Sequence, residues 1–134
     1  MSSLNPTVVN ELTPQELEIF RRDGYLVRRG LADVATCDAI VEVARTHLEV
    51  NLAPIEYEVD VQYPGAPKSK DAPGGDTCRR LLHAYSRADV IRDWAVSAGV
   101  KHTLQALLGS PDNVLSQCHH NCIMTKQPGY SSAT

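Results

Sequence analysis

The residues best suited to chemistry stand together near the end of the chain. Cys118, His119, His120 and Cys122 fall within a short run of sequence. Thiolates and imidazoles are the usual ligands of zinc. Polar and thiol side chains along one strand also commonly line a cavity. The stretch therefore predicts either a metal site or one wall of a pocket.

Strand geometry favours the pocket wall. A turn at residues 110–113 and Pro128-Gly129 bracket this stretch, so we expect residues 114–126 to be extended. Alternate side chains then face opposite ways. One face carries Cys118, His120, Cys122 and Met124, and the other carries Gln117, His119, Asn121, Ile123 and Thr125.

The two cysteines of this stretch are too far apart to share a metal ion if the stretch is a strand. Four steps separate Cys118 from Cys122, which is roughly 13 Å at about 3.3 Å per residue. Zinc binds each sulfur at about 2.3 Å. A small zinc-binding domain therefore stays only an alternative, and the spacing alone gives no role to His119 or His120.

Helices must position this strand, and the sequence predicts where two of them begin. Thr13, Pro14 and Glu16 form the pattern of a capped helix start, and Gly24 suits the helix end. A β-prone run, Tyr25–Val27, follows. Asp33 is expected to cap a helix over residues 34–50.

The helix over 34–50 has an apolar stripe, and two more helices follow later in the chain. The stripe predicts a buried Cys37, and its members are Cys37, Ile40, Val41, Ala44 and Leu48. Ser86 is expected to cap a helix that carries Val90, Ile91 and Trp94. Another helix begins after Gly99 and stops at Gly109.

Residues 55–63 alternate between apolar and polar side chains, which predicts a half-buried strand. Glu56, Glu58 and Asp60 would then line a solvated face, with a hard-cation site as the alternative. Residues 64–77 hold three prolines and three glycines and predict a long flexible loop. A surface loop and the rim of an active site are both open readings of that loop.

Composition limits the class of protein. A chain of 134 residues suits one domain, over 1–134. The net charge of −3 argues against a nucleic-acid or membrane-surface partner. The chain shows no membrane span and no signal peptide, so we expect a cytoplasmic protein. Its four cysteines are accordingly expected to be free thiols.

Two segments resemble the phytanoyl-CoA dioxygenase family. Leu12–Val27, a helix ending in Asp-Gly before a β-prone run, is similar to that family's opening, and the similarity continues through Leu31–Ala44. His120–Pro128 is similar to the strand before the family's iron motif. The resemblance implies an α+β fold: N-terminal helices plus the first strands of a double-stranded β-helix, or jelly-roll, which is incomplete in this chain.

The resemblance also implies a chemistry. Members of the family bind Fe(II) through His-x-Asp and a distant His, the facial triad of oxygenases, and decarboxylate 2-oxoglutarate while hydroxylating a small or acyl-type substrate. No His-x-Asp occurs in this sequence, which ends about where the motif is expected. The iron, and the arginine that holds the far carboxylate of 2-oxoglutarate, would therefore require later residues.

Two residues match the cosubstrate site of the family. Cys122 falls where the family packs a residue on 2-oxoglutarate, and Arg80 falls near a basic residue that reaches it. A plain surface arginine is the alternative for Arg80. No catalytic or metal-binding residue carries over, so the chain alone is expected to be inactive. The alternatives are a non-catalytic fragment or binding module, which would associate through an open sheet edge, with itself or with a partner.

Overall fold

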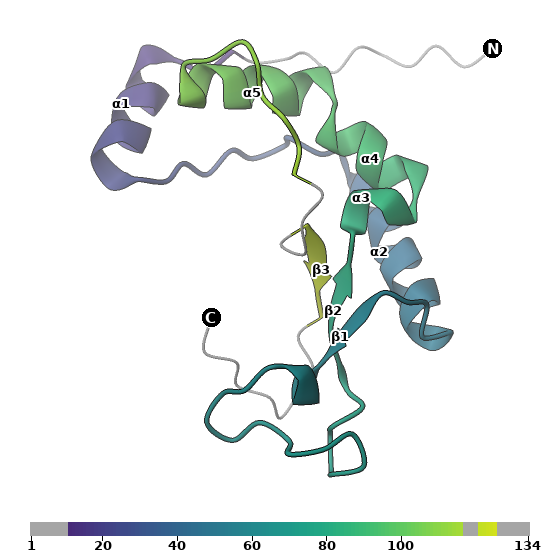
Figure 1. The fold of residues 1–134 in the computed structure, drawn as a ribbon. Coiled ribbons are helices and arrows are strands. Elements are labelled where there is room, and N and C mark those ends of the chain that lie inside the picture. The colour runs from purple at the N-terminus through teal and green to yellow at the C-terminus, as the bar shows by residue number, and fades with distance from the viewer. Residues whose placement is uncertain (1–10, 117–120, 126–134) are drawn as a thin grey trace, which may run out of the picture.

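A computed structural model describes residues 11–116 and 121–125 as an α+β arrangement. In chain order the elements are α1 (Pro14–Asp23), α2 (Val34–Glu49), β1 (Ile55–Tyr57), the 3-10 helix η1 (Glu58–Asp60), β2 (Cys78–Leu82), α3 (Ala84–Arg87), α4 (Asp89–Ala95), α5 (Ala98–Leu108) and β3 (Cys122–Met124). Helices α1, α4 and α5 gather at one end, α2 runs beside the small sheet in the middle, and the connection from β1 to β2 forms the other end (Figure 1).

The predicted starts of α1 and α2 are confirmed. The Thr13 hydroxyl accepts from the Glu16 N–H, and the Glu16 carboxylate accepts from the Thr13 N–H at 2.8 Å, a complete capping box. Asp33 caps α2 through the Thr36 N–H at 2.7 Å. Gly24 ends α1 and Gly109 ends α5, both in the left-handed conformation that glycine adopts without strain.

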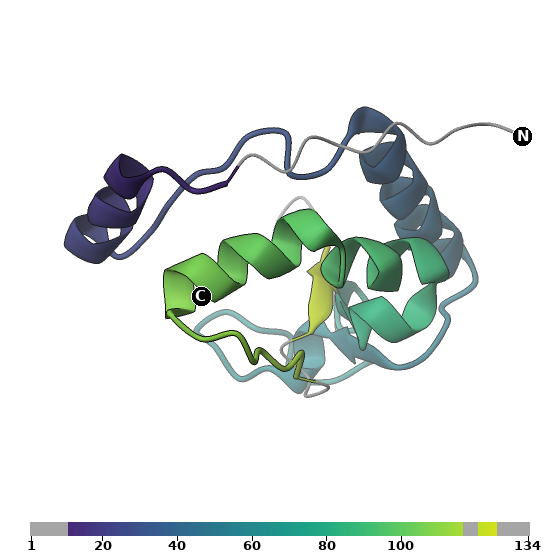
Figure 2. The same cartoon turned by 90° about the horizontal axis from the view of Figure 1, so that it is seen from above.

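The β-prone run after α1 forms no strand. Tyr25–Val27 is an irregular link between α1 and α2. Tyr25 is 66% exposed and Val27 is 68% exposed, and neither pairs with a strand of the sheet. Seen from above, α1 stands away from α2 and lies near α5 (Figure 2). The prediction failed because a strand needs a pairing partner as well as local propensity.

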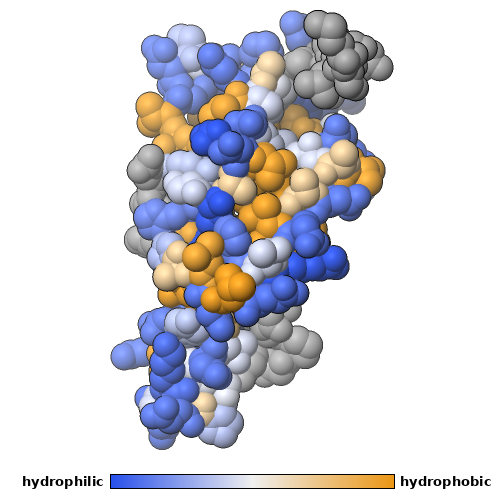
Figure 3. Space-filling view, turned by 90° about the vertical axis from the view of Figure 1, so that its right-hand side faces the viewer, coloured by the Kyte–Doolittle hydropathy of each residue, from blue (hydrophilic) through white to orange (hydrophobic). Residues whose placement is uncertain are grey.

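The buried stripe of α2 is rotated from the predicted one. Cys37 is exposed, and so is Val41 at 46%. The half-buried side chains are Thr36, Ile40, Val43, Ala44, His47 and Leu48. Their spacing follows one helical face that is centred to one side of Cys37. The prediction of a buried Cys37 was therefore wrong, and some apolar side chains of α2 stay on the surface. Hydrophobic residues are visible among hydrophilic ones on the face shown in Figure 3.

The helix that Ser86 was expected to cap begins later. Ser86 lies inside the short helix α3, and its N–H donates to the His83 carbonyl at 3.0 Å. The residue before α4 is Ala88, which makes no side-chain cap. His83 adopts a left-handed conformation, with φ of 56°, where the chain turns from β2 into α3.

The three strands form one antiparallel sheet in the order β1-β2-β3. Ile55 pairs with Leu81, and Leu81 pairs with Ile123, so these apolar residues share one face. Leu81 is fully buried. Ala84 and Ile91, from the helices after β2, are also buried, which places the small core against this face of β2.

Residues 55–63 do not form the long strand that their alternation predicted. Pairing stops at Tyr57, and η1 turns the chain away from β2. Tyr57 donates its N–H to the Asp60 carboxylate at 2.7 Å, which holds that turn. Glu58 is only 3% exposed, so its assignment to a solvated face was wrong.

Residues 64–77 contain no helix or strand, as predicted. The segment has regular turns: Ala72 donates to the Ser69 carbonyl, and Gly75 donates to the Ala72 carbonyl at 2.8 Å. Lys70 also lies over the Tyr57 ring, 4.2 Å from its centre. Among the helices of the described residues, none has both the length and the apolar character that crossing a membrane requires.

Candidate functional site

A β-bulge in β2 builds the most charged part of the sheet. Glu56 pairs with Arg80, but the next residue, Tyr57, pairs with Cys78. Arg79 is therefore an extra residue on β2 with no partner on β1. A bulge of this kind bends the strand and redirects its side chains. Two consecutive arginines, which would face opposite ways in a regular strand, can then reach the same acid.

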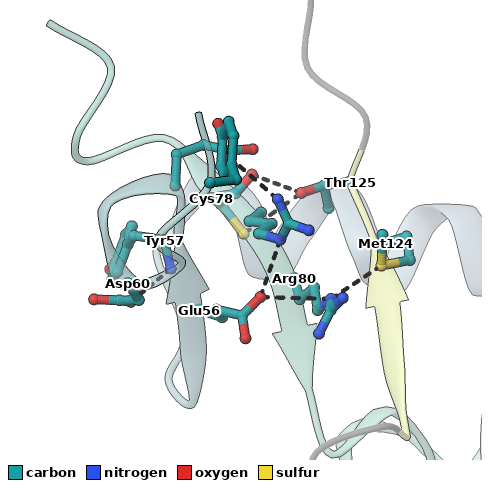
Figure 4. Close-up of polar contacts among 10 residues, drawn as sticks. Glu56, Tyr57, Asp60, Cys78, Arg80, Met124 and Thr125 are labelled. Atoms are coloured by element: carbon teal, nitrogen blue, oxygen red, sulfur yellow. Dashed lines mark hydrogen bonds and ion pairs between the residues drawn. The ribbon is translucent and has the colours of Figure 1, made fainter. Parts of the chain in front are cut away.

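Glu56 is that acid. Its Oε1 lies 3.2 Å from Arg79 Nε and 3.4 Å from Arg80 Nε (Figure 4). Both distances allow strong charge attraction. Neither contact has hydrogen-bond geometry, and Glu56 Oε1 and Arg79 Nε are buried without a hydrogen bond among the described residues. The carboxylate is therefore held by charge, with its hydrogen-bonding capacity poorly used.

Glu58 completes the cluster on its inner side. Its Oε2 lies 3.5 Å from Arg79 Nη1 and accepts a hydrogen bond from the Tyr63 hydroxyl at 2.6 Å. The side chains of Arg79 and Glu58 are each 4% exposed. The Arg79 guanidinium also stands 5.5 Å from the centre of the Tyr63 ring. Glu56, Glu58, Arg79 and Arg80, which we call the ionic cluster, thus balance two positive with two negative charges.

The outer part of the ionic cluster is reachable from solvent. Arg80 and Glu56 side chains are 20% and 19% exposed, several times more than Arg79. Arg80 sits opposite Met124 of β3, and its Nε lies 3.2 Å from Met124 Sδ. Sulfur is a weak acceptor. Arg80 is therefore a half-buried cation with only modest partners for its donors.

The two predicted cosubstrate residues lie on one face of the sheet. Cys122 pairs with Leu82, two residues beyond Arg80, and Met124 pairs with Arg80 itself. Strand alternation therefore places Arg80, Cys122 and Met124 on the face opposite Leu81. The prediction that Cys122 and Met124 share a face is confirmed. Cys118, His119 and His120 lie outside the described residues.

The cysteines of the described residues, Cys37, Cys78 and Cys122, are free thiols. Cys78 is buried, and burial raises the pKa of its thiol. The Thr125 hydroxyl donates to the Cys78 carbonyl at 2.7 Å and lies 3.7 Å from its sulfur. A raised pKa keeps the thiol protonated near neutral pH, so Cys78 is a poor nucleophile.

Arg87 of α3 fixes the far end of the same strands. Its guanidinium donates to the carbonyls of Leu82 at 2.7 Å and Leu52 at 3.0 Å, and to that of Pro54. It also lies 3.3 Å from His47 Nδ1 of α2. Burial lowers the pKa of Arg87. One side chain therefore joins α2, the start of β1 and the end of β2, which sets the position of the sheet that carries Arg80.

Within residues 11–116 and 121–125, no three His, Cys, Asp or Glu side chains come together as a metal site. The strand acids that could have bound a hard cation are instead neutralised: Glu56 and Glu58 face arginines, and only Asp60 is exposed. A shallow groove elsewhere, between residues 11–12 and α5, is lined by Arg28, His102 and Thr103. His102 is exposed there.

Sequence reasoning missed the ionic cluster. The signal was present: acids alternate over residues 56–60, and Arg79-Arg80 follows the long loop. Opposite charges on two segments of like length suggest cross-strand pairs. The bulge at Arg79 could not be read in advance, because it depends on the register of β1 against β2.

Comparison with known proteins gives this chain no relative: no family model, no curated protein and no solved structure matches it.

Proposed function

We propose that this chain forms the helical cover and first strands of an Fe(II)- and 2-oxoglutarate-dependent oxygenase with a jelly-roll fold, similar to the phytanoyl-CoA dioxygenase family. The complete enzyme would be a cytoplasmic hydroxylase of a small or acyl-type substrate. One observation carries the proposal. Arg80 and Cys122, which the resemblance assigns to 2-oxoglutarate, share one face of the sheet.

The residues of this chain fit the cosubstrate better than the metal. An arginine guanidinium suits a carboxylate, because it can offer two parallel N–H donors. Arg80 would hold a carboxylate of 2-oxoglutarate, and Cys122 would pack against its carbon chain and exclude water. Iron does not fit: the sequence has no His-x-Asp, and the described residues bring no three ligands together. The proposal places the iron ligands on residues that follow Thr134.

The reading frame beyond Thr134 provides the test. We expect it to encode His-x-Asp within a few codons. The longer product should form succinate from 2-oxoglutarate when Fe(II) is supplied. Residues 1–134 alone should form none above background. Arg80→Ala in the longer product should raise the KM for 2-oxoglutarate about ten- to a hundredfold, because a charge-assisted hydrogen bond is worth about 1.5–3 kcal/mol.

A pair of cysteine variants supplies the control. Cys122→Ser should change the KM for 2-oxoglutarate, whereas Cys37→Ser, on the exposed side of α2, should not. A longer product that contains His-x-Asp, folds and binds Fe(II) but forms no succinate would contradict the proposal. Stoichiometric zinc in the purified chain, lost on Cys118→Ser, would replace it with the zinc-binding reading.

A binding module is the second candidate, and the open edge of β3 favours it. Arg79 pairs with Thr125 through the Thr125 N–H at 3.1 Å. Hydrogen-bonded pairs alternate along an antiparallel ladder, so the backbone groups of Cys122 and Met124 point away from β2. Within the described residues, β3 has no strand on that side. Such an edge can accept another strand by backbone pairing.

A further inference from the structure

The ionic cluster uses the donors of Arg80 incompletely. Within the described part of the chain, Arg80 contacts Glu56 Oε1 at 3.4 Å and Met124 Sδ at 3.2 Å, both through Nε. The forked pair of donors that an arginine presents to a carboxylate involves two nitrogens at once. Glu56 does not engage that fork, because the same oxygen is drawn toward Arg79 Nε at 3.2 Å.

The bulge explains why Glu56 is divided between two arginines. Arg79 has no partner on β1, and its side chain is 4% exposed. A buried guanidinium must be neutralised, and Glu58 does so with Oε2 at 3.5 Å. Tyr63 holds that second carboxylate in place at 2.6 Å. Arg79 therefore retains a charge partner if Glu56 turns toward solvent.

Exposure indicates which part of the cluster a solute can reach. Arg80 and Glu56 are about one-fifth exposed, whereas Arg79 and Glu58 are nearly fully buried. Figure 4 shows the Glu56 carboxylate beside Arg80, with Arg80 extending on toward Met124. An incoming carboxylate would meet Arg80 first and would have to compete with Glu56 for it.

We propose that Glu56 is an internal competitor that occupies the carboxylate site of Arg80 and is displaced when a small dicarboxylate binds. This inference rests on the proposed function for the identity of the ligand, 2-oxoglutarate, but the competition concerns residues of this chain alone. Glu56 stabilises Arg80 in the absence of ligand. An external carboxylate replaces the single, misaligned contact with a forked pair of hydrogen bonds.

Binding of two probes to residues 1–134 tests the competition. Titration calorimetry with 2-oxoglutarate and with succinate should show weak binding to the wild type. Glu56→Gln should bind both probes about tenfold more tightly, since the competing charge is gone. Arg80→Ala added to Glu56→Gln should abolish the gain. Asp76→Asn, which removes an exposed acid of the neighbouring loop, is the matched control and should leave binding unchanged.

Two further measurements guard against misfolded variants. Glu56→Asp keeps the charge but withdraws it from Arg80, so its affinity should fall between those of wild type and Glu56→Gln. In the wild type, the Nε resonance of Arg80 should shift with succinate while that of Arg79 moves less. Equal affinities for wild type and Glu56→Gln, or a gain that survives Arg80→Ala, would overturn the inference.

The outcome separates this inference from the proposed function. Suppose that the longer product turns over 2-oxoglutarate but Glu56→Gln binds it no more tightly than the wild type does. Competition by Glu56 would then be disproved, and the oxygenase function would stand. Tighter, Arg80-dependent binding of succinate by Glu56→Gln, with no turnover in the longer product, would leave a regulated dicarboxylate site in a protein that is not an oxygenase.

Discussion

One residue, Gly75, decides whether the connection from β1 to β2 can adopt its tight turn. Gly75 is buried, and its N–H donates to the Ala72 carbonyl at 2.8 Å. A Cβ added at Gly75 would meet backbone atoms of Ser69 and Lys70, among them Lys70 O at 2.8 Å and Lys70 Cα at 2.9 Å. Backbone atoms cannot rotate away as a side chain does. Only glycine therefore fits at position 75 without displacing the backbone.

Gly75→Ala should destabilise the protein by about 1–3 kcal/mol, the usual cost of forcing atoms into a filled site. The displaced turn should also move Lys70 off the Tyr57 ring. Urea unfolding, followed by circular dichroism, gives the free energy of unfolding.

Gly99→Ala is the matched control. A Cβ at Gly99 meets only Leu31 Cδ1, at an ordinary 3.5 Å. Gly99 lies in α5, where alanine is favoured over glycine by about 0.5–1 kcal/mol. The two variants should therefore shift stability in opposite directions, and a loss of stability for both would show that space is not the reason.

At the scale of the element, α1 depends on its ends more than on its packing. None of its residues is buried. Hydrogen bonds from the Thr13 backbone and side chain, in that order, lower the pKa of Glu16. A lowered pKa means that this cap contributes stability above the ordinary carboxyl pKa and loses it as the pH falls through the folded value.

Thr13→Ala should weaken the start of α1 by about 1 kcal/mol, because the N-cap hydroxyl is lost. Amide hydrogen exchange resolves the effect, which should be confined to the first turns of α1. Thr13→Ser, which keeps the hydroxyl, should preserve the protection. Acidification of the wild type through the lowered pKa of Glu16 should weaken the same turn, because the Thr13 N–H then loses its charged acceptor. An unchanged exchange pattern in Thr13→Ala would mean that tertiary packing holds α1.

The helices were predictable from sequence because their signals are local. Thr13, Asp33, Gly24 and Gly109 act on residues within four positions of themselves, and all four do what their types predict. The covered face of α2 was not predictable in the same way. Cys37 lies on the exposed side of α2 because α4 and β2, which are far along the chain, decide which face is covered.

The strands were less predictable, since pairing joins residues far apart. Residues 55–63 alternate like one strand, yet pairing stops at Tyr57 and Glu58 turns inward to Arg79. Arg80 and Cys122 were predicted from resemblance as cosubstrate residues, and their common face follows from the register of β2 and β3. The role of Glu56 could not be anticipated, because only the bulge brings two arginines to it.

Over the whole molecule, the buried apolar core of the described residues is small: Cys78, Leu81, Ala84 and Ile91. Many large apolar side chains are exposed, including Leu108 at 62% and Val114 at 97%. Within the described residues β3 also has an unpaired edge, and we predict that the two features lead to association with another copy or with a partner.

Met124→Pro should reduce self-association if it proceeds through β3. Proline removes the N–H of Met124, which points away from β2, and leaves the bonds of Ile123 and Thr125 to β2 in place. Sedimentation velocity over a range of concentrations measures the change. Leu108→Ser is the control, because it removes exposed apolar surface remote from the edge. A wild type that stays monomeric, or association lost equally in both variants, would argue against the edge.

The bulge at Arg79 also restricts how this sheet can change in length. β3 pairs with β2 continuously through Arg79, whereas β1 passes over it. At Arg79, the pairing of β2 is therefore irregular with β1 and regular with β3. Deleting Arg79 would restore one-to-one pairing with β1, but it would bring Cys78 to the place opposite Thr125 that Arg79 now occupies. A change in the length of β2 therefore alters its pairing with at least one of its two neighbours.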